Sequence, residues 1–162
     1  MENSNQNDTY LNLLEDALKK KNIVLDKLLL LTQEQETLIS AGNVEEEEFL
    51  LVIDKKEEQI SLINQLDEGF DQLYQRVKNE LIESKDKYVT QIVALQVLIR
   101  EITDKSVRLQ TCEVRNRNKL EHYLQTKRKE IKDFKVNNKT VSNYYKNMNV
   151  QQQESYFFDK KK

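Results

Sequence analysis

Proline and tryptophan are absent from this 162-residue chain, and glycine occurs only twice, as Gly42 and Gly69. Because proline and glycine mark turns and interrupt helices, their scarcity favours long continuous helices. It also excludes the glycine-rich loops that bind phosphate groups. With a charged fraction of 33%, the composition argues against β-sheets and indicates an all-α protein.

Cysteine and histidine are equally rare, with one of each, Cys112 and His122. A single cysteine excludes an internal disulfide and is typical of a reducing compartment. No cysteine or second histidine stands at metal-ligand spacing from His122, so we interpret it as an exposed structural residue. The motifs G-x-S-x-G and H-E-x-x-H are also missing. We therefore expect neither an enzyme nor a bound metal or cofactor.

Long hydrophobic runs are absent too. Runs such as Leu28–Leu31 are far shorter than the roughly 20 residues that span a bilayer. The first ten residues are polar and acidic, without the basic and apolar regions of a secretory signal. We expect a cytoplasmic protein without stable membrane insertion.

What the chain does contain is apolar residues at alternating intervals of three and four, the spacing of one helix face. A first helix is expected after Asp8 as its N-cap and ends before Gly42, which suits a left-handed turn. Asn43 is expected to cap a second helix, whose apolar face runs from Phe49 to Leu81. The four glutamates 45–48 suit the positive end of that helix better than a metal site, because consecutive helical side chains diverge.

The third expected helix begins after a turn near residues 82–86 and runs from Ser84 to about Phe134. At 1.5 Å per residue it is about 75 Å long, and polar Glu113 and Asn116 fall on its apolar face. We predict an antiparallel bundle of three long helices over residues 1–135. The third helix should protrude and leave the later part of its apolar face open.

Charge is divided unevenly along the chain. Residues 1–84 carry a net charge of about −11 and residues 85–162 about +9, so folding should bring opposite signs together. The balance of the two halves predicts a weak long-range field and no nucleic-acid binding.

Residues 136–162 form a polar tail in which aromatic residues stand out. Large apolar groups in such a segment typically dock into a partner. The candidate docking residues are Tyr144, Tyr145, Tyr156, Phe157 and Phe158.

The chain resembles the FlgN-type flagellar export chaperones in its three long helices. The local similarity lies in Lys55-Lys56-Glu57 on the second helix, the run 116–120 (Asn-Arg-Asn-Lys-Leu) on the third, and Tyr144 with the ending 156–160. The resemblance implies a cytoplasmic chaperone that binds the C-terminal amphipathic segments of hook-associated proteins, prevents their premature assembly and delivers them to the type III export gate.

The same resemblance implies roles for two groups of residues. The tail aromatics, with Tyr144 or Tyr145 foremost, would dock on the cytoplasmic domain of the export gate. The client would lie helix-in-groove on a surface made of Leu109, Cys112, Asn116, Leu120, Tyr123, Leu124, Ile131 and Phe134.

Two alternatives remain beside the chaperone. Residues 109–134 could instead form a self-associating coiled coil in a homodimer without any client. An adaptor that binds a membrane or nucleic acid through its basic half would show a steep salt dependence.

Overall fold

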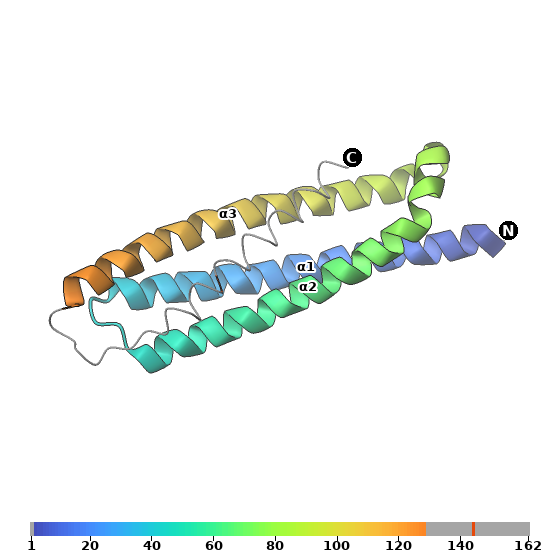
Figure 1. Cartoon of the computed structure of the whole chain (residues 1–162). Coiled ribbons are helices and arrows are strands. Elements are labelled where there is room, and N and C mark those ends of the chain that lie inside the picture. The colour runs from blue at the N-terminus through green and yellow to red at the C-terminus, as the bar shows by residue number, and fades with distance from the viewer. Residues whose placement is uncertain (1, 129–143, 145–162) are drawn as a thin grey trace.

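The protein is an all-α bundle of three long helices, as the sequence predicts (Figure 1). The computed structural model describes residues 2–128 and Tyr144. Helix α1 spans Glu2–Ser40, α2 spans Glu46–Glu83, a short 3₁₀ helix η1 spans Lys85–Tyr88, and α3 spans Val89–Lys127. The three long helices have 39, 38 and 39 residues, and the described residues include no β-strand.

The turn between α2 and α3 lies where it was predicted, although neither proline nor glycine produces it. The backbone N–H of Ser84 donates to the carbonyl of Glu80 at 2.8 Å, and that of Lys87 donates to the carbonyl of Ser84 at 3.0 Å. One tight 3₁₀ turn therefore ends α2 and redirects the chain into α3.

The boundaries near the first two N-termini differ from the predictions. Helix α1 begins at Glu2, so Asp8 lies within the helix and does not cap it. Helix α2 is preceded by Glu45 in extended conformation, not by Asn43. The reason lies in Val44, which is buried and donates its backbone N–H to the hydroxyl of Tyr123 at 3.0 Å. This anchor holds the chain extended for two residues beyond the predicted cap.

The left-handed turn expected at Gly42 is confirmed. Gly42 has a φ of 84°, the left-handed conformation that glycine adopts readily after a helix. Gly69 lies inside the continuous helix α2, and apart from the nearby backbone of that helix no described atom stands within 4 Å of where its Cβ would be. No other described helix therefore crosses close to Gly69.

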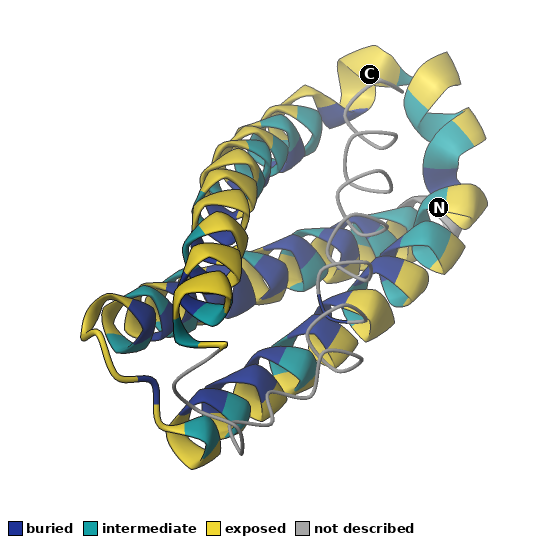
Figure 2. Cartoon of the chain, turned by 60° about the vertical axis from the view of Figure 1, so that its left-hand side comes forward, coloured by how far each residue is buried: buried dark blue, intermediate teal, exposed yellow. Residues whose placement is uncertain are grey.

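Helix α1 is the middle of the bundle. It packs against both α2 and α3, whereas within the described residues no Cα of α2 comes within 8 Å of a Cα of α3 (Figures 1 and 2). Helices α1 and α2 run antiparallel, and α1 and α3 run parallel. The core is formed by apolar residues from all three helices, among them Leu14, Leu28, Phe49, Ile53, Ile63, Ile102 and Leu109.

Opposite charges meet between the acidic and basic halves, as expected. Lys105 lies 2.8 Å from Asp26, and Arg115 and Lys119 both lie within 3.0 Å of Glu36. These pairs join α1 to α3. They are partly exposed, so each contributes little to stability.

Candidate functional site: a buried polar cluster

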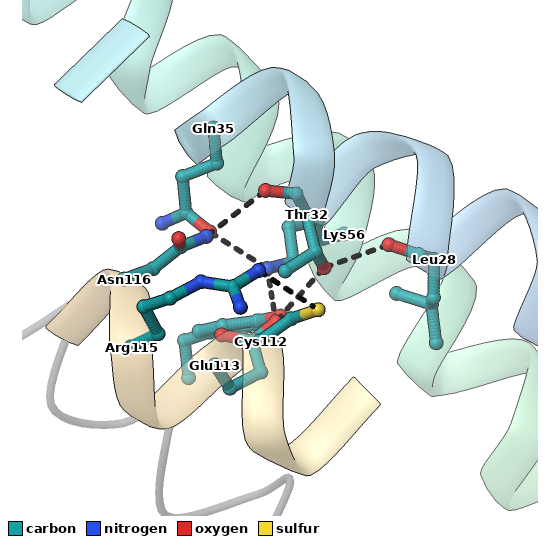
Figure 3. A network of polar contacts seen from close by, with 9 residues as sticks. Leu28, Thr32, Gln35, Lys56, Cys112, Glu113, Arg115 and Asn116 are labelled. Carbon is teal, nitrogen blue, oxygen red and sulfur yellow. Dashed lines mark hydrogen bonds and ion pairs between the residues drawn. The ribbon is translucent and has the colours of Figure 1, made fainter. Parts of the chain in front are cut away.

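A cluster of polar side chains lies inside the bundle where all three helices contribute to it (Figure 3). Helix α1 supplies Thr32 and Gln35, α2 supplies Lys56, and α3 supplies Glu113 and Asn116. All five side chains are buried. Because burying polar and charged groups is costly unless they are paired, this is the part of the core that most needs an explanation.

Glu113 is the centre of the cluster. Its Oε1 accepts hydrogen bonds from the ammonium of Lys56 and from the hydroxyl of Tyr144. The hydroxyl oxygen of Thr32 lies 3.0 Å from the same Oε1 and 2.7 Å from the carbonyl oxygen of Leu28. One carboxylate oxygen thus links α1, α2 and α3 to a residue far along the C-terminal part of the chain.

Two amide side chains complete the cluster. Lys56 Nζ donates to Gln35 Oε1 at 2.8 Å, and Asn116 Nδ2 donates to the carbonyl oxygen of Thr32 at 2.9 Å. Three buried polar atoms of the cluster have no hydrogen-bond partner among the described residues: Glu113 Oε2, Gln35 Nε2 and Asn116 Oδ1. The cluster therefore keeps unused acceptors and a donor, in addition to a buried ion pair.

Burial controls the acid–base behaviour of the lysine. Removal from water lowers the pKa of Lys56 from 10.5 to about 8, because the ammonium loses its hydration. The neighbouring Glu113 carboxylate acts in the opposite direction and only partly offsets this effect. Lys56 therefore titrates closer to neutrality than an ordinary lysine.

Tyr144 is the C-terminal member of the cluster. Its side chain is fully buried, and Lys56 Nζ lies 4.3 Å from the centre of its ring. The ring thus meets α2 through a cation–π contact, while its hydroxyl meets α3 through Glu113. We had expected Tyr144 to be exposed for docking, but its side chain is buried in the cluster, where its hydroxyl donates to Glu113 and its ring contacts Lys56.

The predicted client surface is not open either. Leu109, Asn116, Leu120 and Tyr123 are buried, and Cys112 and Leu124 are half-buried. Helix α1, which has as many residues as α3 and runs beside it, covers the face that we expected to be open. Ile131 and Phe134 lie outside the described residues, as do Tyr145, Tyr156, Phe157 and Phe158.

A second buried ion pair joins α1 to α2 farther along the bundle. Lys21 Nζ lies 2.7 Å from Asp67 Oδ1, and both side chains are buried. Burial raises the pKa of Asp67 above its ordinary value, and the nearby lysine only partly opposes this. The pair joins two helices, whereas the contacts of Glu113 join all three.

The described part of the chain has neither a metal-binding cluster nor a membrane-spanning helix. It contains no group of three or more histidine, cysteine, aspartate or glutamate residues arranged to hold a metal ion. None of its helices is both long enough and apolar enough to cross a membrane. The polar cluster is therefore the candidate functional site in the described part of the chain.

Comparison with protein-family models, with curated proteins and with solved structures finds no match to this chain.

Proposed function

We propose that this chain binds an amphipathic helical segment of a partner protein, with the binding site between α2 and α3 beside the polar cluster. The observation that supports this most is the position of Tyr144, a residue from outside the three helices whose side chain bridges α2 and α3. Helices α2 and α3 each pack on α1 and not on each other. A fourth helical element is the usual complement of such an arrangement.

More specifically, we propose that the chain is a cytoplasmic chaperone of flagellar type III export. Its clients would be the C-terminal segments of hook-associated proteins, which it would keep unassembled and deliver to the cytoplasmic domain of the export gate. Support comes from the resemblance in sequence and from the way two of its motifs meet: Lys56 and Asn116 both hydrogen-bond to Gln35 Oε1, at 2.8 and 3.5 Å. Residues of these motifs thus share one cluster.

Titration calorimetry with a peptide from the C-terminus of a hook-associated protein tests the proposal. We expect a one-to-one complex, and an absence of binding at tens of micromolar would contradict it. Binding at the export gate is tested separately, by mixing the protein, with and without the peptide, with the isolated cytoplasmic domain of the gate.

Leu124 is the residue of the predicted client surface best suited to a mutational test, because it is half-buried and packs at the margin of the core. Leu124→Asp should weaken peptide binding at least tenfold, which corresponds to about 1.4 kcal/mol. Leu30→Asp is the matched control, since Leu30 is 66% exposed on α1. Equal affinities of the two variants, with unchanged circular dichroism, would place the binding site elsewhere.

A further inference from the structure

The outer face of α3, opposite the bundle, carries an exposed row of valines. Val93, Val97, Val107 and Val114 are 42–57% exposed, although valine is ordinarily a residue of the interior. Val89, 53% exposed, borders the same row at its N-terminal end. At 3.6 residues per turn these positions fall on one side of the helix. The residues that α3 buries, such as Leu95, Ile102 and Leu109, fall on the other.

The row has the spacing of a coiled-coil seam. Positions 93, 97, 100, 104, 107, 111 and 114 are separated alternately by four and three residues, which is the heptad pattern of a and d positions. Two charged residues, Arg100 and Asp104, interrupt the valines at the centre. Both are exposed, and neither has an ion-pair partner in the part of the chain that the structure describes.

This seam is complementary to itself when a second copy runs antiparallel to it. In antiparallel coiled coils an a residue of one helix faces a d residue of the other. With the twofold axis at residue 102, Val97 faces Val107 of the second copy and Val93 faces Thr111. The same register places Arg100 opposite Asp104 on both sides of the axis, so the two charges of one copy neutralise the two charges of the other.

Other arrangements of the same seam lose this pairing of opposite charges. A parallel pair would place arginine against arginine and aspartate against aspartate, which is destabilising. Shifting the antiparallel pair by one heptad in either direction places each charged residue against an uncharged one, with no ionic partner in the seam. The charge pattern thus selects one direction and one register.

We infer that the outer face of α3 is a homodimer interface in which two copies of this chain pair antiparallel around residue 102. The interface covers α3 from Thr90 to Val114, about 37 Å of helix. It uses neither the polar cluster nor the α2–α3 side, so it is independent of the proposed function. Partner binding and dimerisation would therefore occur on different faces of the protein.

Sedimentation of the full chain over micromolar to near-millimolar concentrations is the first test. We expect a monomer–dimer equilibrium that weakens as salt is added, because opposite charges meet at the centre. A parallel pair would strengthen with salt, because its like charges would be screened. A chain that stays monomeric at every concentration, or a dimer strengthened by salt, would overturn the inference.

Charge exchange is the second test. Arg100→Asp alone, and Asp104→Arg alone, should each weaken dimerisation at least tenfold, because like charges then face each other across the axis. An equimolar mixture of these two variants should form a heterodimer, since every central pair is again of opposite sign. The double variant Arg100→Asp with Asp104→Arg should regain the homodimer.

Lys55→Asp is the control, because Lys55 is exposed on α2 and undergoes the same change of charge sign. It should dimerise like the unaltered chain. Thermal unfolding of each variant shows whether the fold is kept, and we expect it to be kept since the altered residues are exposed. A dimer that tolerates both single charge reversals, or a mixture that fails to associate, would contradict the interface.

Discussion

Glu113 shows at the scale of one residue how this bundle differs from one held together by apolar packing alone. Its carboxylate is buried yet receives a lysine and a tyrosine from two other parts of the chain. A buried ion pair contributes little net stability compared with apolar residues of the same volume. Removing one partner is nevertheless strongly destabilising, because the other charge is then buried without a partner. We therefore expect the ion pair to determine how the helices are aligned, and to add little to the free energy of unfolding.

Glu113→Ala should lower the free energy of unfolding by about 3–5 kcal/mol, because it leaves the Lys56 ammonium buried without its carboxylate. The double variant Lys56→Met with Glu113→Leu should be far less destabilised, since no charge then remains buried. Urea unfolding of the single and double variants measures both effects. A double variant that is destabilised as much as Glu113→Ala would show that the unpaired Lys56 ammonium is not the cause of the loss.

Tyr144 can be probed by removing only its hydroxyl. Tyr144→Phe should reduce the free energy of unfolding by about 1.5–3 kcal/mol, the usual contribution of a hydrogen bond to a charged group. Tyr74→Phe provides a matched control, since the Tyr74 ring is half-buried against Phe70 and its hydroxyl has no hydrogen bond to another described residue. If both variants unfold at the same urea concentration, the phenol of Tyr144 does not contribute as described.

At the scale of the helices, much of the architecture follows from the sequence, because three apolar faces of helical period and two connections are visible in it. Two of the connection residues behave as local chemistry dictates: Gly42 is left-handed, and the chain turns at Ser84. The N-terminus of α2 could not be placed from local signals. It depends on a hydrogen bond between Val44 and Tyr123, which are far apart in the sequence.

The polar cluster could be predicted only in part from the sequence. Thr32, Gln35, Lys56, Glu113 and Asn116 all fall on apolar helix faces, and that misfit is the available signal of a buried network. Which of them would meet depends on how the helices are aligned along one another. The later part of the α3 apolar face was wrongly expected to be open for a related reason, since helix length alone does not reveal that α1 covers it.

The two glycines should respond oppositely to the same change. Gly42→Ala should destabilise the protein by about 1–2 kcal/mol, because its φ of 84° is unfavourable for a residue with a side chain. Gly69→Ala should stabilise it by about 1 kcal/mol, since alanine favours the helix and meets no atom within 4 Å. Urea unfolding of both variants measures the two changes, and a loss of stability in Gly69→Ala would reveal a close contact at that site.

For the whole molecule, the lowered pKa of Lys56 predicts how stability varies with pH. Between pH 8 and 10.5 the unfolded chain binds a proton at Lys56 that the folded chain has released, so stability from this residue should rise with pH across that window. The groups facing Lys56 are Glu113, Tyr144 and Cys112. Working below pH 9.5 limits the ordinary titration of tyrosines elsewhere.

Urea unfolding from pH 7.5 to 9.5 tests this expectation. The unaltered protein should become more stable toward the alkaline end, relative to Lys56→Met, in which the titrating group is absent. Lys55→Met is the matched control, because Lys55 is adjacent to Lys56 in sequence but is exposed. This variant should leave the slope unchanged. Parallel slopes for all three proteins would show that Lys56 does not titrate in this window.

The central place of α1 also constrains how the protein is made. Of the three long helices, α1 is synthesised first. It has two apolar faces, one covered by α2 and the other by α3, and α3 is synthesised last of the three. An α1–α2 hairpin emerging from the ribosome would still expose the leucines that later pack against α3. The nascent chain thus passes through a stage that is vulnerable to aggregation, and only the arrival of α3 ends it.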